Sequence, residues 1–125
     1  MEVHVDKKNV EQIIKDLQAG GFEAHCRTGF LTGRIDGDNM YVDGIYVPEQ
    51  ESSQGLVNIS AENMAKSYES IEESGKKIVG IGHYHGHMGV FESVIDQQIR
   101  LDLPKQGIPA VALIANIKGD YQIFQ

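Results

Sequence analysis

The sequence predicts a single mixed α/β domain over residues 1–125. Two segments place apolar residues at helical spacing, and other segments are short runs rich in β-branched residues, which favour strands. A length of 125 residues suits one domain with one hydrophobic core. With 41% hydrophobic and 23% charged residues, the composition is typical of a folded globular protein and excludes a disordered or fibrous chain.

The N-terminal half predicts a helix followed by a β-hairpin. Asn9 and Gln12 resemble a capping box at the start of the helix, and Gly20 provides its stop. Four apolar residues share one face of this helix: Val10, Ile13, Ile14 and Leu17. We then expect a strand around the glycines at 29 and 33, a turn at 36–38 and a second strand at 40–47.

The C-terminal half predicts two more helices and three strands. We expect residues 48–55 to be a polar surface connection and Ser60 to cap a helix that ends near Gly75. A strand then begins at residue 78 and runs into a cluster of histidines, after which a helix extends from Ser93 to about Asp102. Residues 109–117 are almost wholly apolar and predict a buried strand, and a turn at 118–120 leads to a last strand at 121–124.

Charge and cysteine content narrow the function. Eleven basic and 18 acidic residues give a net charge of −7, which disfavours nucleic acid and anionic membrane surfaces as partners. The sequence contains no apolar run long enough for a signal peptide or a membrane span, so we expect a cytoplasmic protein. Cys26 is the single cysteine, so any metal is expected to be bound mostly by nitrogen and oxygen.

The histidine cluster is the strongest chemical signal. Residues two apart on a strand point the same way, so His83 and His85 present two imidazoles on one face while Tyr84 faces the other. Asp96 lies in the first turn of a helix that starts at Ser93, within reach of that face. Two histidines and a carboxylate leave a fourth tetrahedral position for water, as in catalytic zinc sites. The same residues are also compatible with a plain helix cap and polar surface histidines, and similar ligand sets occur in cupins and iron oxygenases.

The spacing of four of these residues adds a family resemblance. The motif reads His83, one residue, His85, seven residues, Ser93, two residues, Asp96. This spacing resembles the signature of the JAMM (MPN-plus) metallopeptidases, and the segment 88–91 is similar to their prokaryotic branch. The resemblance implies a mixed curved β-sheet flanked by helices and a Zn²⁺-dependent isopeptidase. It makes His83, His85 and Asp96 the zinc ligands, and it gives Ser93 a hydrogen bond to the water or oxyanion. The implied partners are ubiquitin-like or sulfur-carrier proteins, cleaved after their C-terminal tails.

The family also uses a glutamate that takes a proton from the water and returns it to the leaving amine. Glu23 is the candidate, but the usual glutamate stands three residues before the first strand glycine, where this chain has Cys26. A bulge or a longer entry to the strand would bring Glu23 to the site. Glu49 and Glu51 are weaker alternatives in the polar connection.

Other departures concern the segment after the strand. Tyr84 stands where the family usually has serine, and Gly86 and His87 replace the usual proline and its neighbour. We therefore place His87 in a loop, outside the ligand set. The alternative to an enzyme is a noncatalytic MPN-type scaffold that binds partners through the same fold.

Overall fold

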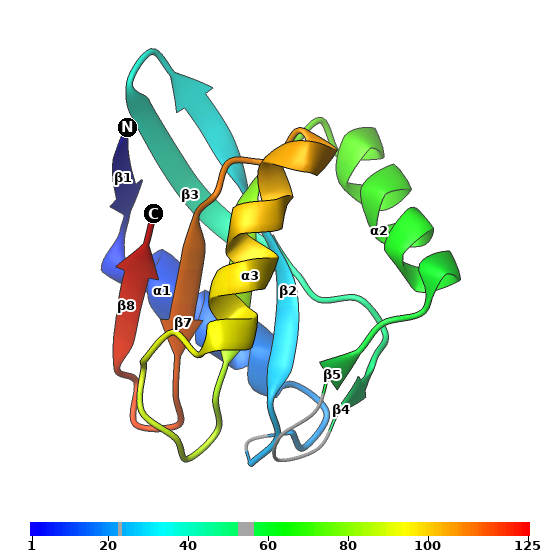
Figure 1. Ribbon diagram of the computed structural model, residues 1–125, viewed down its shortest axis with the longest axis vertical. Coiled ribbons are helices and arrows are strands. Elements are labelled where there is room, and N and C mark those ends of the chain that lie inside the picture. The colour runs from blue at the N-terminus through cyan, green and yellow to red at the C-terminus, as the bar shows by residue number, and fades with distance from the viewer. Residues whose placement is uncertain (23, 53–56) are drawn as a thin grey trace.

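The protein is a mixed six-stranded sheet with helices on both faces, as the computed structural model shows (Figure 1). The structure describes residues 1–22, 24–52 and 57–125. Its main sheet has the strand order β1-β3-β2-β6-β7-β8, and the predicted α/β class is confirmed. The strands of this sheet are β1 (Glu2–Val5), β2 (Arg27–Asp36), β3 (Asn39–Tyr46), β6 (Lys77–Tyr84), β7 (Ala112–Ala115) and β8 (Tyr121–Phe124). A separate two-stranded sheet pairs β4 (Glu51–Ser52) with β5 (Val57–Asn58).

Helix α1 (Lys7–Gln18) covers one face of the sheet, and its four predicted apolar residues are all buried there. The predicted capping box at Asn9 is wrong, because the helix begins three residues earlier, with Asp6 as its N-cap. Asn9 lies within the first turns and donates from Nδ2 to the carbonyl of Val42, 3.4 Å away. The helix stop is confirmed, since Gly20 follows it with a φ of 88° that favours glycine.

Helices α2 (Ala61–Glu73) and α3 (Val94–Asp102) lie on the opposite face, where α3 lies over the sheet and runs roughly along its strands (Figure 1). Both predicted caps are confirmed: Ser60 Oγ accepts from the amide of Asn63, and Ser93 Oγ accepts from the amide of Asp96. A short 3₁₀ helix, η1 (Leu103–Gln106), follows α3 and ends at Gly107. No helix in the described part of the chain is long and apolar enough to cross a membrane.

The predicted hairpin is formed by β2 and β3, which pair antiparallel around a turn at Gly37. The strand β1 was not predicted, and it pairs parallel with β3 at the sheet edge. The buried strand predicted at 109–117 is present in a shorter form as β7.

The central pair of strands, β2 and β6, positions the histidines. In their antiparallel register, Thr28 lies opposite His83 and Gly29 lies opposite Gly82. A Cβ atom at Gly29 would come within 2.7 Å of the Tyr46 carbonyl, so only glycine allows the sheet to pack this closely. Tyr84 points to the α1 face, as expected, and its hydroxyl accepts from Gln18 Nε2 at 3.0 Å.

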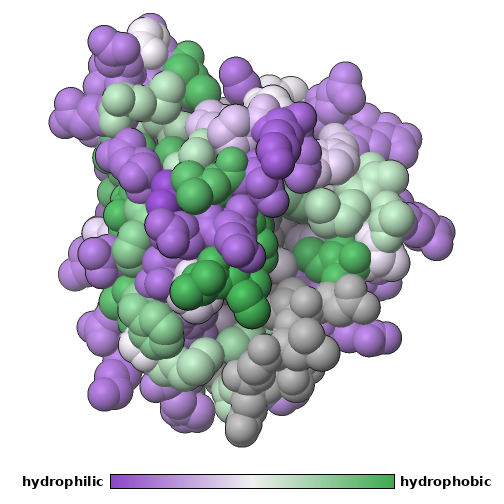
Figure 2. Space-filling view, viewed as in Figure 1, coloured by the Kyte–Doolittle hydropathy of each residue, from purple (hydrophilic) through white to green (hydrophobic). Residues whose placement is uncertain are grey.

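Helix α3 exposes several apolar side chains among its polar ones. Val94 and Ile95 are largely exposed on this helix, as is Leu101 near its end. Figure 2 shows apolar residues gathered over α3, beside a hollow that separates it from α2. An exposed apolar surface of this kind is typical of a binding face.

Candidate metal centre

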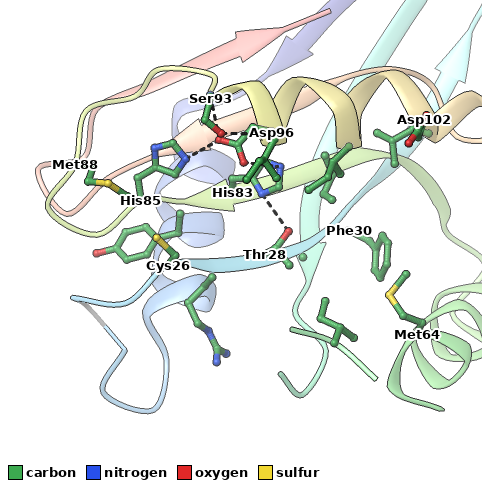
Figure 3. Close-up of a pocket in the computed structure, with 18 of the residues that line it drawn as sticks. Cys26, Thr28, Phe30, Met64, His83, His85, Met88, Ser93, Asp96 and Asp102 are labelled. Carbon is green, nitrogen blue, oxygen red and sulfur yellow. Dashed lines mark hydrogen bonds and ion pairs between the residues drawn. The ribbon is translucent and has the colours of Figure 1, made fainter. Parts of the chain in front are cut away.

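A pocket of about 620 Å³ opens between α3, α2 and the ends of β2 and β6 (Figure 3). The polar side chains at one end of this pocket are Cys26, Thr28, His83, His85, Ser93 and Asp96. Its other walls are mainly apolar, with Asp102 and Gln106 as polar exceptions, and include Phe30, Ile59, Met64, Ile81, Ile99 and Leu103. The structure therefore brings together His83 and His85, at the end of β6, with Ser93 and Asp96, at the start of α3.

His83, near the end of β6, is held in one tautomer by its neighbour on β2. Thr28 Oγ1 donates to the carbonyl of Gly82 at 3.0 Å, so its oxygen is left to accept from His83 Nδ1, 3.3 Å away. The proton of a neutral His83 is therefore on Nδ1, and the lone pair is on Nε2. That Nε2 atom is buried without a hydrogen bond to any described residue, and it lies 3.9 Å from Asp96 Oδ1.

His85, one residue beyond β6, is oriented in the same way by a backbone carbonyl. Its Nδ1 donates to the carbonyl of Gly89 at 2.9 Å, and its Nε2 lies 3.1 Å from Asp96 Oδ2. The ring of Phe91 packs edge-on against it, with 5.4 Å between the ring centres. Both histidines thus direct Nε2 at the same carboxylate, as Figure 3 shows.

Asp96 is fixed by the start of α3. Its amide donates to Ser93 Oγ at 3.1 Å, and its Oδ2 accepts from the amide of Ser93 at 3.4 Å. The capping box and the histidine site therefore share one carboxylate, and the two interpretations of Ser93 and Asp96 are compatible. The cap sets the direction in which Asp96 faces the histidines.

The pKa shifts follow from this geometry. Burial tends to raise the pKa of Asp96, but the hydrogen bond from His85, the charge of His83 and the bonds from Ser93 lower it to about 2. Burial lowers the pKa of His83, against the opposing effect of Asp96. The hydrogen bond to Asp96 raises the pKa of His85. The carboxylate is therefore ionised at neutral pH, and a cation between it and the imidazoles is favoured.

That cation is either a proton or a metal ion. Two imidazole lone pairs and a carboxylate are all acceptors, so they repel one another unless a positive charge lies between them. In a tetrahedral zinc site with bond lengths near 2.1 Å, a ligand nitrogen and a ligand oxygen lie about 3.4 Å apart. The two nitrogen-to-oxygen distances here, 3.1 Å and 3.9 Å, lie on either side of that value.

The residue types therefore fit zinc, but in this structure His85 and Asp96 are hydrogen-bonded directly to each other. Among the described residues, no three His, Cys, Asp or Glu side chains already stand as a group that could hold a metal ion. Ligation would require His85 and Asp96 to exchange their direct hydrogen bond for bonds to the ion.

The loop between the histidines and Ser93 has two buried anchors. Arg100 on α3 makes a bidentate ion pair with Glu92, with bonds of 2.8 Å from Nε and 3.0 Å from Nη2. Asn116, after β7, donates from Nδ2 to the carbonyl of Met88. Gly86 starts the loop with a φ of 61°, which proline cannot adopt, so the departure from the family pattern at this position is structural.

The structure gives less information about the residues considered as the catalytic base. Glu23 lies outside the described residues, whereas Cys26 lines the pocket. The register of β2 with β6 is regular from Arg27 to Leu31, and its irregularity falls further along, between Leu31 and Thr32. Glu49 and Glu51 are exposed and are not among the lining residues of the pocket. His87 is also exposed and outside that lining, as expected.

Sequence reasoning did not identify Thr28, Glu92 or Arg100 as part of the site. Thr28 follows from strand pairing, because residues opposite His83 on a neighbouring strand share its face. Glu92 precedes the helix that carries Arg100, so the i,i+4 spacing of helical ion pairs gives no signal for them.

Comparisons with known proteins concern the fold alone. No protein-family profile matches the sequence, and no curated protein matches it. Among solved structures, the solution structure of protein DSY2949 from Desulfitobacterium hafniense is similar, with a TM-score of 0.71 and 18% sequence identity. The similarity covers 97% of this chain and 80% of that chain. The chain therefore shares its α/β fold with the Desulfitobacterium hafniense protein.

Proposed function

We propose that this protein is a zinc-dependent metallopeptidase of the JAMM (MPN-plus) type, with a fold of the JAMM/MPN kind. One observation carries the proposal: His83 Nε2 and His85 Nε2, with their tautomers set by Thr28 and the Gly89 carbonyl, converge on Asp96. Hydrogen bonds that fix the second nitrogen of each ring are typical of metal-binding histidines. The motif spacing and the α/β fold support the same assignment.

The residues of the chain have separate tasks in this reaction. Zinc held by His83, His85 and Asp96 would lower the pKa of a bound water to about 7 and so supply a nucleophile at neutral pH. Ser93 Oγ accepts from the Asp96 amide, so its own proton is available to an oxygen of the substrate as negative charge develops there. Glu23 is the proposed base that takes a proton from the water and passes it to the leaving amine.

The proposed substrates are peptide or isopeptide bonds after the C-terminal tail of a ubiquitin-like or sulfur-carrier protein. Support comes from the pocket, whose apolar walls continue away from the histidines between α2 and α3. Met88, Phe91 and Ile95 add exposed apolar side chains to its lining. Such a surface suits an extended, uncharged tail that must lie across the site.

A second function is favoured by two other observations. Cys26 occupies the position where the resemblance expects glutamate, and α3 exposes four apolar side chains, Val94, Ile95, Ile99 and Leu101. Both suit a noncatalytic MPN-type scaffold that binds a partner without cleaving it. The two functions differ in what happens to a bound tail.

A cleavage assay separates them. The substrate is a ubiquitin-like or sulfur-carrier protein fused through its C-terminal tail to a reporter, and the enzyme is tested before chelation, after chelation and after zinc is restored. We expect cleavage that chelation abolishes and zinc restores, and that is lost in His83→Ala and Glu23→Gln but retained in the control His87→Ala. Zinc-loaded His83→Ala that cleaves as fast as wild type would exclude the enzyme, and binding without cleavage in every form would favour the scaffold.

A further inference from the structure

Cys26 lies on the same face of the sheet as the candidate zinc ligands. It directly precedes β2, in which Arg27 lies opposite Tyr84 and Thr28 lies opposite His83. Extending this antiparallel register by one residue places Cys26 opposite His85, and residues that face each other across two strands share a side of the sheet. Both residues line one pocket, and Cys26 lies below His85 in Figure 3.

The thiol also responds to the charge of the site. Burial raises the pKa of Cys26, and the negative charge of Asp96 raises it further. A positive ion bound to Asp96 would act in the opposite sense and favour the thiolate, which is the form of cysteine that binds metals.

A second, independent observation points to a ligand at this place. His83 is 93% buried, since its exposure is 7%, and its Nε2 has no hydrogen bond to a described residue. A buried nitrogen of this kind costs free energy unless a partner satisfies it. Its lone pair is directed into the pocket that Cys26 also lines.

We propose that Sγ of Cys26 is the fourth zinc ligand, completing a set with His83, His85 and Asp96. The inference rests on the proposed function, because it assigns a further residue to the same ion. On ligation the thiol loses its proton to solvent, a zinc–sulfur bond forms, and the water in the fourth position leaves. No oxidant or reductant takes part.

The consequence is a site with two forms. With four protein ligands the zinc is closed, as in structural zinc sites, and with three it is open, as in catalytic ones. The closed form has no position for the nucleophilic water, so cleavage by the wild type would come only from the fraction of molecules whose thiolate has left the ion. Cys26 stands where the resemblance expects the catalytic glutamate. At that position this chain would therefore have a residue that limits activity by binding the zinc.

Cobalt provides the direct test. Co²⁺ is added in place of zinc to wild-type protein, Cys26→Ser and Cys26→Ala, and the absorption spectrum is recorded. We expect a near-ultraviolet thiolate-to-cobalt charge-transfer band in the wild type that is missing from both variants, while all three bind one cobalt per chain. Because the chain contains one cysteine, the band has only one source.

Alkylation of the wild-type thiol gives a measurement that needs no variant. Zinc should slow alkylation of Cys26 by iodoacetamide by about tenfold or more, since a ligated thiolate is a poor nucleophile. Cobalt bound by the wild type without the charge-transfer band, or alkylation at an unchanged rate with zinc bound, would overturn the inference and leave the proposed function standing. Wild-type protein that binds neither metal would overturn both.

Discussion

The hydroxyl of Thr28 lies 3.3 Å from Nδ1 of His83, across the antiparallel pair of β2 and β6. Thr28 directs its own proton to the Gly82 carbonyl, so it can only accept from the histidine. This relationship leaves the Nε2 lone pair of His83 facing Asp96. A neighbouring side chain thus decides which nitrogen of His83 keeps a lone pair for a cation.

Removal of this hydroxyl should weaken zinc binding. In Thr28→Val we expect zinc affinity to fall by about 10–100-fold, the usual effect of losing a hydrogen bond that orients a ligating histidine. The control is Thr32→Val on the same strand, whose hydroxyl bonds Asp43 at 2.9 Å and has no contact with the histidines. Competition with a chromophoric chelator measures both affinities, and equal affinities in the two variants would contradict the role of Thr28.

Ser93→Ala should affect both stability and catalysis. Loss of the N-cap costs about 1 kcal/mol of stability, and loss of a donor to the developing negative charge lowers kcat by about 10²–10³-fold. Ser60→Ala is a matched control, because Ser60 caps α2 through a hydrogen bond of the same length, 3.1 Å, away from the histidines. Denaturation and tail cleavage are measured on both variants. Equal kcat values would show that Ser93 acts only as a cap.

Loss of either Glu92 or Arg100 alone should destabilise the protein more than loss of both. Their side chains are only 9% and 10% exposed, so removing one partner leaves a buried, uncompensated charge. We expect Glu92→Gln or Arg100→Met to lower the free energy of unfolding by about 3–5 kcal/mol, and the apolar double variant Glu92→Leu/Arg100→Met to recover much of it.

The exposed pair of Asp102 and Lys105 serves as the comparison for this experiment. Its side chains are 62% and 79% exposed, so Lys105→Met should cost less than about 1 kcal/mol. Urea denaturation of the metal-free proteins gives all four values. An effect of Arg100→Met as small as that of Lys105→Met would show that the buried pair does not hold the loop.

Zinc affinity should depend on pH through His85. Asp96 raises the pKa of this histidine, so protons compete with zinc for Nε2 below that raised value. Asp96 itself, with a pKa of about 2, stays ionised over the whole accessible range. We expect affinity to be constant at high pH and to fall by about tenfold per pH unit once His85 is protonated. Chelator competition between pH 8 and pH 5 tests this, and a flat profile would contradict zinc binding at His85.

The sequence predicts most of the fold where the signal is local. The helical spacing of Val10, Ile13, Ile14 and Leu17 and the caps at Ser60 and Ser93 are properties of short segments, and the structure confirms them. The strand β1 could not be predicted in this way, because its four residues are stabilised by parallel pairing with β3, more than thirty residues away. The start of α1 was misplaced because Asn9, a common cap, bonds to the sheet instead.

In the candidate site too, the sequence predicts features that depend on one segment and does not predict contacts between segments. Strand parity and helix capping place His83, His85, Ser93 and Asp96 from sequence, because each depends on its own segment. Their orientation depends on contacts between segments that are distant in sequence, such as the hydrogen bond from His83 to Thr28 and the one from Asn116 to the Met88 carbonyl. Pairing of strands and closure of the loop decide these contacts, and neither leaves a periodic pattern in the sequence.

The zinc content of the purified protein tests the central claim most directly. Wild type, His85→Ala and His87→Ala are saturated with zinc, dialysed and analysed for metal per chain. The two variants lose the same side chain, two residues apart, but His85 is buried against Asp96 whereas His87 is exposed outside the pocket. We predict one zinc per chain in the wild type and in His87→Ala, and none in His85→Ala. A wild type without zinc, or His85→Ala that retains as much as the wild type, would contradict the assignment of a metal centre.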